Sequence, residues 1–468
     1  MTRYLYRSRH PDVAYVDASL WLPKRHIHVE AIQNALEFFD VTRTGPKKYR
    51  MWRETRDHLT CPREFVPRQN YGKYPFPFVI DRPTEFEKTG LAFRRPFEYR
   101  DSRQEKSYQA LRQADGGVFN CGAGRGKTVM ITKKMIDVGG PALVITHLAG
   151  LVDQWRRSLL WFTNLSDSDI GIIKEDRFEW DRPVVLAMIQ TLSRRAVSGD
   201  LPAGFSRRFA LTDYDECHHL AAPFFLPTAS LCEGERIGTT ATDLRSDGLE
   251  FMYHYHIGAA FYRDKEIDCP PTGYFHSTRV EASKEELERA QERFKDDLGR
   301  WDKRVSISKL RGVLAENPEF IRSRELLLRE LLSRGRKIIA LSHSKKLLRI
   351  LHERFSGSVC ITQEVEYQER LPLMRQSQLC LIVAQLGTEA LDDVRLDAGV
   401  ALYPFSSEVW LEQFVGRIGR LNLDDPEKKA EFHILEDEKI EDFANACQKM
   451  RKWFRKQQYP FFLREAPR

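Results

Sequence analysis

The chain has 468 residues and a net charge of +7, with 42% hydrophobic and 30% charged residues. This length is too great for one hydrophobic core, so two or three domains are expected. The sequence contains no apolar run near the roughly 20 residues that cross a bilayer. Its basic N-terminus lacks the apolar stretch of a secretory signal. The 8 cysteines form no C-x-x-C pair, which argues against a zinc site or a disulfide framework and predicts a cytoplasmic protein.

Positive charge gathers at the two ends of the chain. Residues 1–100 hold 19 Lys and Arg against 12 Asp and Glu, an excess equal to that of the whole chain. Residues 447–468 hold seven Lys and Arg against one Glu. Two basic ends predict a polyanionic partner such as nucleic acid. The alternative, that the charge only keeps the protein soluble, stays open at this point.

The first segment, residues 1–96, is rich in basic and aromatic residues and in turn-forming pieces such as NYGKYPFPF (70–78). We expect a small α+β accessory domain that binds nucleic acid. Aromatic side chains among cations suit base stacking and phosphate contact, although each could equally belong to a small core. The candidates are Trp21, Tyr49, Trp52, Tyr71 and Phe76.

From residue 97 to 265 short apolar runs alternate with helical stretches. Buried parallel strands have this appearance, because helices cover both faces of their sheet. The expected strands are 116–121, 142–147, 184–189, 209–215 and 236–242. We therefore expect one α/β domain with a parallel sheet in this range.

The stretch CGAGRGKT (121–128) ends like a phosphate-binding loop, although Cys121 stands where the usual pattern has glycine. A short strand precedes the stretch and a helical segment follows it, as a phosphate loop requires. Gly122, Gly124 and Gly126 give the backbone freedom. In such a loop Lys127 reaches the β- and γ-phosphates of a nucleotide, and the Thr128 hydroxyl binds Mg²⁺. The alternative is a glycine-rich turn with a surface lysine.

A second acidic motif, DECH, ends the strand 209–215. A magnesium–nucleotide site needs a carboxylate near the metal and a group that positions water. We assign Asp215 to the metal shell and Glu216 to the water. Cys217 and the two histidines that follow it do not predict zinc, because adjacent residues cannot close a tetrahedral site alone.

The remaining chain predicts a linker, a second α/β domain and a tail. Residues 266–335 include EASKEELERAQERFKDDLGRW, charged with a helical period, and are expected to be a helical connecting segment. Apolar strands return at 337–343, 379–385, 399–403 and 431–436, which predicts an α/β domain over 336–445. Residues 446–468 are expected to form a basic helical tail. Its Trp453 and Phe454 favour packing over base stacking.

The second α/β domain carries QFVGRIGR (413–420) in place of a phosphate loop. Arg417 and Arg420 are three residues apart and would share a face if this segment is helical. Guanidinium groups match phosphate oxygens in a bidentate manner, so an arginine supplied to a bound nucleotide from a second domain would assist phosphoryl transfer. The alternative is a solvated basic helix.

Taken in order over about 97–440, these motifs resemble those of superfamily 2 helicases. CGAGRGKT is similar to motif I, in which the first position is only required to be small, and THLAGLVDQW (146–155) is similar to motif Ia. DECH resembles motif II, TAT (240–242) motif III, ALSHS (340–344) motif IV, GTEALD (387–392) motif V and QFVGRIGR motif VI. The stretch YHYHIGAAFYR (253–263) resembles the XPB-like and UvsW-type phage recombination helicases.

The resemblance implies two RecA-like domains that bind ATP and Mg²⁺ between them and move on DNA, in the host cytoplasm if the protein is phage-encoded. It implies catalytic roles for Lys127, Asp215, Glu216, Gln413, Arg417 and Arg420. It implies ATP-binding roles for Gln104, Gly122, Gly124, Arg125, Gly126, Lys127, Thr128 and Asp392, with Thr128 and Asp215 at the metal. It implies nucleic-acid contact or coupling roles for Thr146, Gln190, Thr191, Thr240, Thr242, Arg245, Ser342, Lys345 and Thr388.

The expected activity is therefore that of an ATP-dependent DNA helicase or translocase acting on single-stranded or branched DNA, as in recombination and repair. Three alternatives remain open from sequence alone: an RNA helicase, a double-strand translocase that does not separate strands, and a binding module with a vestigial ATPase. No membrane partner is expected.

Overall fold

A computed structural model describes residues 9–42, 45–122, 124–241, 248–264, 266–295, 301–387, 393–405, 407–422 and 424–467. Four of the predicted site residues, Thr242, Arg245, Thr388 and Asp392, lie outside these ranges. The chain divides into two compact units, Met1–Lys265 and Glu266–Arg468. None of the described helices is long and apolar enough to cross a membrane.

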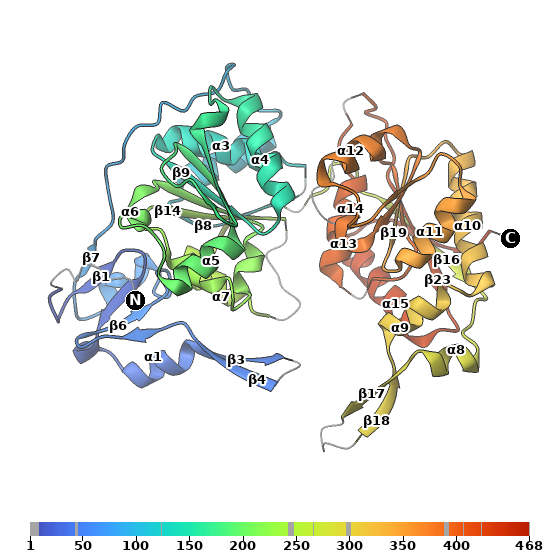
Figure 1. Ribbon diagram of the computed structural model, residues 1–468, viewed down its shortest axis with the longest axis horizontal. Helices are drawn as coiled ribbons and strands as arrows, with labels where there is room; N and C mark the ends of the chain where they lie inside the picture. Colours follow the sequence, from blue (N-terminus) through green and yellow to red (C-terminus); the bar gives the residue numbers. More distant parts are fainter. Residues whose placement is uncertain are drawn as a thin grey trace. The chain divides into compact units, whose positions relative to one another are not determined.

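The first unit begins with a small α+β domain (Figure 1). Its five-stranded sheet has the order β5-β6-β2-β1-β7, and a separate hairpin, β3–β4, follows helix α1. The bounds are β1 Ala14–Val16, β2 Leu20–Pro23, α1 Val29–Ala35, β3 Glu37–Thr42, β4 Gly45–Arg50, β5 Arg53–Glu54, β6 His58–Cys61 and β7 Phe78–Ile80. The candidate stacking aromatics largely pack within this domain: Tyr71 stacks on Phe78 with ring centroids 3.8 Å apart, and Phe76 is buried.

The rest of the first unit is a RecA-like α/β domain built on an eight-stranded sheet of order β11-β10-β12-β9-β13-β14-β8-β15. Every pairing in this sheet is parallel except that of β10 with β11. The strands are β8 Gly116–Cys121, β9 Ala142–Thr146, β10 Ile170–Lys174, β11 Arg177–Phe178, β12 Val184–Met188, β13 Leu211–Asp215, β14 Glu235–Thr240 and β15 Ala260–Asp264. The helices are α2 Ser102–Gln113, α3 Lys127–Val138, α4 Ala149–Phe162, α5 Ile189–Ser198, α6 Phe205–Arg208 and α7 Glu250–Ile257.

The side chains of alternate strand residues pack into two separate hydrophobic cores, one on each face of this sheet. In β9, Leu143 and Ile145 pack on one face, in the core shared with α5, α7 and the N-terminal domain. Val144 packs on the other face, in the core formed with α3 and α4. This burial on both faces is why the strands read as continuous apolar runs in the sequence.

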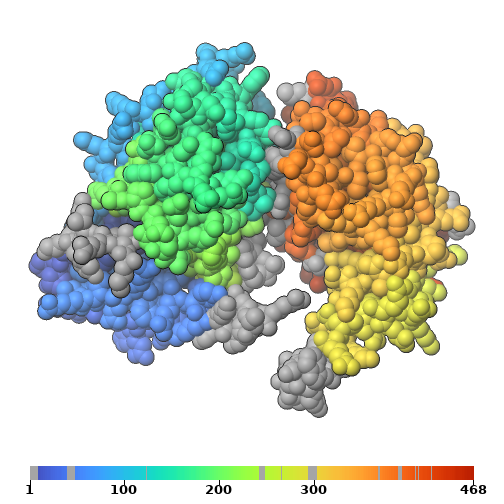
Figure 2. All heavy atoms as spheres, in the orientation of Figure 1, coloured from blue at the N-terminus to red at the C-terminus, as the bar shows by residue number. Residues whose placement is uncertain are grey.

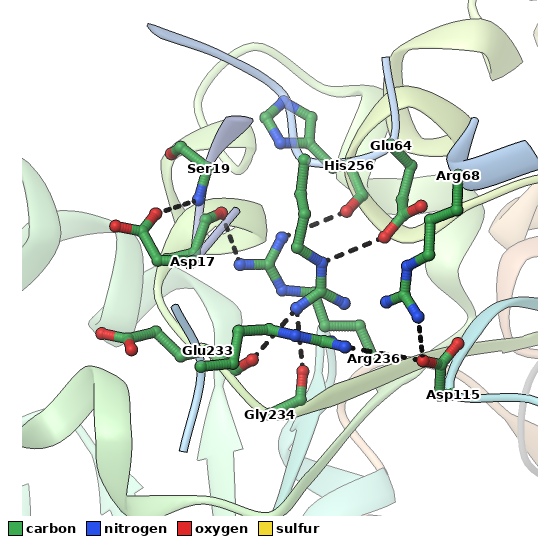
Figure 3. Close-up of polar contacts among 12 residues, drawn as sticks. Asp17, Ser19, Glu64, Arg68, Asp115, Glu233, Gly234, Arg236 and His256 are labelled. Atoms are coloured by element: carbon green, nitrogen blue, oxygen red, sulfur yellow. Dashed lines mark hydrogen bonds and ion pairs between the residues drawn. The ribbon is translucent and has the colours of Figure 1, made fainter. Parts of the chain in front are cut away.

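The N-terminal domain and the α/β domain of the first unit are joined by two fully buried arginines. Arg63 Nη1 donates to the carbonyl oxygens of Gly234 (2.8 Å) and Glu233 (3.2 Å). Arg236 Nη1 donates to His256 O at 3.1 Å, as Figure 3 shows, and its Nη2 donates to Ala18 O at 2.6 Å. Buried cations need such partners, so the two domains form one body, and Figure 2 shows no separation between them.

The second unit holds a seven-stranded, all-parallel sheet of order β20-β21-β19-β22-β23-β16-β24. Its strands are β16 Thr272–Thr278, β19 Ile338–Ser342, β20 Val359–Ile361, β21 Leu379–Val383, β22 Ala398–Ala401, β23 Glu431–Asp437 and β24 Phe461–Glu465. The helices are α8 Lys284–Arg289, α9 Ile307–Leu314, α10 Pro318–Ser333, α11 Lys345–Arg354, α12 Tyr367–Gln376, α13 Ala384–Gly387, α14 Glu408–Ile418 and α15 Glu441–Lys456. A hairpin of β17 Gln291–Lys295 and β18 Trp301–Val305 lies between α8 and α9 (Figure 1).

Two predicted boundaries differ from the structure. Residues 266–335 are not only a helical connector, because they supply strand β16 and the hairpin, and α9 and α10 pack into the core of the second domain. The tail is not only helical, because β24 follows α15 and pairs with β16. Trp453 and Phe454 are buried in the second domain, as their packing role predicted.

One buried ion pair fixes α10 to the sheet of the second domain. Arg324 and Asp437 are both fully buried, and Arg324 Nη1 lies 2.9 Å from Asp437 Oδ1. Thr278 Oγ1 donates to the same carboxylate at 2.7 Å. Buried charges of this kind are tolerated only when they are paired and hydrogen-bonded.

Candidate ATP site and its comparison with known proteins

The phosphate-binding loop follows β8, and α3 begins at its last residues. Gly124 and Gly126 both have positive φ angles, of 78° and 79°, which favour glycine. Lys127 opens α3, and its Nζ donates to the carbonyl oxygen of Cys121 at 2.9 Å. The lysine is therefore held over the loop by the residue that replaces the usual first glycine. The Cys121 side chain is fully buried in the core, and burial raises the pKa of its thiol to about 11.

Gln104 lies directly against this loop. A Cβ atom on Gly126 would come within 2.6 Å of Gln104 Nε2. The side-chain Oε1 of Gln104 accepts from the Arg100 N–H at 2.8 Å, and the backbone N–H of Gln104 donates to Asp101 Oδ1 at 2.7 Å, which caps α2. Arg100 also donates to Gly124 O at 3.0 Å. Gln104, which was predicted to bind ATP, is thus adjacent to the predicted phosphate loop.

Two other predicted loop residues, Gly122 and Arg125, lie close to Asp264 at the end of β15. The Gly122 N–H donates to Asp264 O at 2.9 Å. Arg125 is buried, with its Nε 3.9 Å from Asp264 Oδ2 at the end of β15. The structure therefore places the Arg125 guanidinium beside the carboxylate of Asp264.

The acidic pair stands at the end of β13, which is separated from β8 by β14 alone. The Trp155 indole donates to Asp215 Oδ2 at 2.8 Å. Desolvation, followed by the neighbouring Glu216 charge, raises the pKa of Asp215 to about 6. Glu216 has a φ of 53°, an unusual backbone conformation for a residue other than glycine. Such local strain is common at functional sites.

Strand β14 connects to this acidic pair through two threonines. Thr240 is buried, and its hydroxyl lies 3.3 Å from Glu216 Oε2 and 3.1 Å from His218 Nδ1. Thr239 lies 3.4 Å from Asp215 Oδ1 and 3.5 Å from Asp213 Oδ2. The predicted coupling residue Thr240 is therefore in direct contact with Glu216.

A pair of stacked histidines links the acidic motif to the loop after β9. The rings of His147 and His219 stack with centroids 3.7 Å apart, and His218 lies 4.3 Å from His219. Desolvation lowers the pKa of His147 to about 4, so its ring is neutral at physiological pH. The Gln190 amide donates to His147 O at 2.9 Å. The segments that carry the predicted nucleic-acid residues Thr146 and Gln190 therefore touch the acidic motif through His147.

Three of the predicted nucleic-acid contacts prove to be buried. Thr146 donates to Leu148 O (3.1 Å), and Thr191 accepts the Glu175 N–H (3.0 Å). Ser342 donates to Ser344 O (3.0 Å) within the turn that precedes α11. These hydroxyls shape their loops and do not reach the surface. Gln190 and Lys345 are partly or largely exposed, and Lys345 pairs with Glu364 at 3.5 Å.

The arginine motif lies at the end of α14 in the second domain. Gln413 and Arg417 are in the helix, but α14 ends at Ile418, so Arg420 lies beyond it and the two arginines do not share a helical face. Both arginines are only 9% exposed, and burial lowers the pKa of Arg420 to about 10. A Cβ on Gly419 would come within 2.8 Å of the Cys269 carbonyl, so this close approach requires glycine.

Sequence reasoning missed four residues of this neighbourhood: Asp213, Thr239, His147 and Trp155. The strand period contained a signal for Asp213, because residues two apart in β13 face the same side as Asp215. Asp213 is fully buried, and desolvation together with the Asp215 charge raises its pKa well above the usual range. The contacts of His147 and Trp155 are long-range and left no pattern in the sequence.

Comparison with known proteins agrees with this geometry. Residues 88–242 match the family described as "Type III restriction enzyme, res subunit". The chain is 35% identical over 160 residues to the "DNA 3'-5' helicase XPB" of Mycobacterium tuberculosis, covering 34% of this chain and 28% of that protein. It is 24% identical over 343 residues to "Probable helicase D10" of Escherichia phage T5, covering 69% of this chain and 68% of that protein.

A solved structure, S. cerevisiae Dbp5 bound to RNA and ADP BeF3, has the same fold, with a TM-score of 0.54 and 12% identity over 77% of this chain and 89% of that one. The strand-end motifs resemble those of superfamily 2 helicases. The chain is similar to XPB-like and phage helicases, as the motifs predicted. It spans about a quarter of the length of the mycobacterial relative.

Proposed function

We propose that the protein is an ATP-dependent DNA helicase or translocase. The observation that carries this proposal is the convergence of the phosphate loop, the acidic pair and Thr240 at the ends of β8, β13 and β14. These ends lie at one edge of one parallel sheet, and ligands of such sheets bind beyond the carboxyl ends of the strands. The names of two relatives that match this region, a DNA 3'-5' helicase and a probable helicase, support the same activity.

In this proposal the chain's own groups bind and orient the nucleotide. Lys127, now resting on the Cys121 carbonyl, turns to the β- and γ-phosphates, and Gln104 contacts the base. Glu216 accepts a hydrogen bond from the attacking water and orients it. The αL backbone of Glu216 and its contact with Thr240 hold the carboxylate in place.

The site also fits a magnesium ion. Thr128 and Asp215 offer oxygen ligands, which Mg²⁺ prefers. Desolvation, followed by the Glu216 charge, raises the pKa of Asp215, and a divalent cation would stabilise the two neighbouring carboxylates together. When bound with ATP, Mg²⁺ neutralises phosphate charge. Gln413, Arg417 and Arg420 of the second domain are proposed to act on the γ-phosphate.

We further propose that nucleic acid binds the surface near Gln190 in the first domain and Lys345 in the second. The N-terminal domain, fixed to the first α/β domain by Arg63 and Arg236, moves with it and adds affinity for duplex or branched DNA. A 3′-to-5′ direction, the one in the mycobacterial relative's name, is the expected polarity.

The test compares ATPase rates with single-stranded DNA, duplex, fork, four-way junction and RNA at one stated salt concentration, because phosphate contacts make binding strongly salt-dependent. The proposal predicts the largest stimulation with a DNA. Stimulation by RNA alone would replace it with an RNA helicase. Fork unwinding assays, run beside triplex displacement on duplex DNA, separate a helicase from a translocase that leaves strands paired.

A further inference from the structure

The outer face of α15 and the neighbouring strand β24 form a surface that the proposed ATPase does not use. A groove of about 840 Å³ lies between them. We call it the C-terminal groove. Its lining residues are Asn445, Gln448, Lys449, Arg451, Lys452, Arg455 and Leu463.

The lining of the C-terminal groove carries four cations and no carboxylate. Arg451 Nη1 forms an ion pair with Glu436 Oε2 at 2.5 Å. Lys449, Lys452 and Arg455 are exposed, and among the described residues no carboxylate lies within 4 Å of either lysine. The apolar residues of α15, such as Cys447 and Met450, face inward to the core, so the charged stripe is the free face of an amphipathic helix.

Strand β24 leaves one edge of the sheet open. It is the last strand of its sheet and pairs only with β16 among the described residues. The Gly273 N–H donates to Pro460 O and the Ala466 N–H to Ser277 O, both at 2.9 Å. Since bonding alternates along a strand, the even-numbered residues of β24 bond β16. The N–H and C=O groups of Leu463 and its odd-numbered neighbours therefore point to the open edge.

This open edge also exposes apolar side chains. Leu463 is 65% exposed and Phe462 is 52% exposed. An exposed edge strand with apolar residues is a template for pairing with another chain, and proteins normally cover it or protect it with charge. Here the strand itself carries the exposed Leu463 beside the basic groove.

We propose that the C-terminal groove binds an extended acidic peptide that adds to β24 as a further strand. Alternate side chains of an added strand lie about 7 Å apart on one face, so acidic residues at every second position would reach Lys449, Lys452 and Arg455. The intervening apolar residues would cover the other face beside Phe462. The proposed peptide site is separate from the proposed ATP site, and peptide binding does not require ATPase activity.

An acidic peptide can contact more kinds of group on this surface than a nucleic acid can. A phosphate backbone would neutralise the three exposed cations but would not pair with the backbone groups of the edge or cover the exposed Phe462. An acidic, partly apolar strand supplies backbone hydrogen bonds, apolar contact and negative charge together, as in other strand-addition complexes.

The experiment uses the full chain and a fluorescein-labelled ten-residue peptide in which Glu and Val alternate. Fluorescence anisotropy measures its binding beside that of decaglutamate and of a 20-nucleotide single strand. Lys452→Glu changes the groove. Lys456→Glu, on the same helix but outside the groove and paired with Glu408 at 3.8 Å, is the matched control for charge and helix position.

We expect the alternating peptide to bind, Lys452→Glu to weaken it by about tenfold, and Lys456→Glu to weaken it by less than about twofold. Two further peptides carry N-methyl groups on every Glu or on every Val. Because these N–H groups point to opposite edges of the strand, only one of the two methylated peptides should lose binding.

Four results would overturn the proposal. Equal affinity for decaglutamate, or an equal effect of both methylated peptides, would show binding by charge without strand addition. If Lys452→Glu weakened the oligonucleotide and spared the peptide, the groove would be a nucleic-acid surface. Absence of peptide binding up to about 1 mM would remove the site itself.

Discussion

The contact between Gly126 and Gln104 allows a quantitative test of the phosphate loop. Replacing Gly126 by alanine has two separable costs. The first is backbone strain: φ is 79°, and an L-residue in this region costs about 1–2 kcal/mol. The second is steric, because the new Cβ would lie 2.6 Å from Gln104 Nε2. Moving that amide breaks its hydrogen bond with the Arg100 N–H, at a cost of about 1 kcal/mol.

Gly204→Ala is the matched control. Gly204 also lies in the first unit, has a φ of 85°, and nothing lies within 4 Å of its added Cβ. It should therefore show the backbone cost alone, about 1–2 kcal/mol, against about 2–3 kcal/mol for Gly126→Ala. Only Gly126→Ala should also weaken ATP binding, since it displaces the base-contacting glutamine.

The assay is chemical unfolding of the two variants and titration with a fluorescent ATP analogue. Adding Gln104→Ala removes the side chain that the new Cβ at position 126 would overlap. The double variant should therefore lose less free energy of unfolding than the sum of the losses in the two single variants. Equal destabilisation by Gly126→Ala and Gly204→Ala, or strict additivity with Gln104→Ala, would refute the contact on which this reasoning rests.

Four further predictions follow from the same site and core. Cys121→Ala keeps nucleic-acid-stimulated ATPase activity, because only the backbone carbonyl of this residue holds Lys127; loss of activity would show that the thiol matters. ATPase activity falls as the pH drops through about 6, because Asp215 must lose its proton to bind the metal and its pKa is raised to about 6. Added Mg²⁺ should move this fall in activity to lower pH. A pH–rate profile that does not respond to Mg²⁺ would contradict the assignment of Asp215 to the metal. His219→Ala lowers the DNA-stimulated rate, and His219→Phe, which preserves the ring stack on His147, restores it; equal rates in the two variants would argue against the stack. Arg324→Ala leaves Asp437 buried without its partner and destabilises the second domain by about 3–5 kcal/mol, whereas Arg329→Ala on the exposed side of the same helix costs less than about 1 kcal/mol.

The sequence predicted the parallel sheets well, because buried strands are short and apolar on both faces. The predicted strand 116–121 coincides with β8, and 142–147 and 184–189 differ from β9 and β12 by one residue. The nucleotide motifs were recognisable because glycine, lysine and paired carboxylates directly follow buried strands. Packing of a hydrophobic core does not explain such residues.

The errors have physical causes. Residues 291–295 and 301–305 belong to a segment with many charges at helical spacing, but they pair as antiparallel strands, since tertiary placement overrides weak local propensity. Strand β24 was missed because FFLRE has one exposed edge and lacks a continuous apolar pattern. The roles of Arg63 and Arg236 were not predicted, because nothing in the local sequence shows that they are buried against carbonyl groups.

The central claim is that ATP bound through Lys127 is hydrolysed in response to DNA. The most direct measurement is the steady-state ATPase rate of the wild type and of Lys127→Ala, each with and without single-stranded or forked DNA. The account predicts that DNA raises the wild-type rate by at least about tenfold and that Lys127→Ala has no DNA-dependent activity. A Lys127→Ala protein with full stimulated activity, or a wild type that ignores DNA, would contradict it.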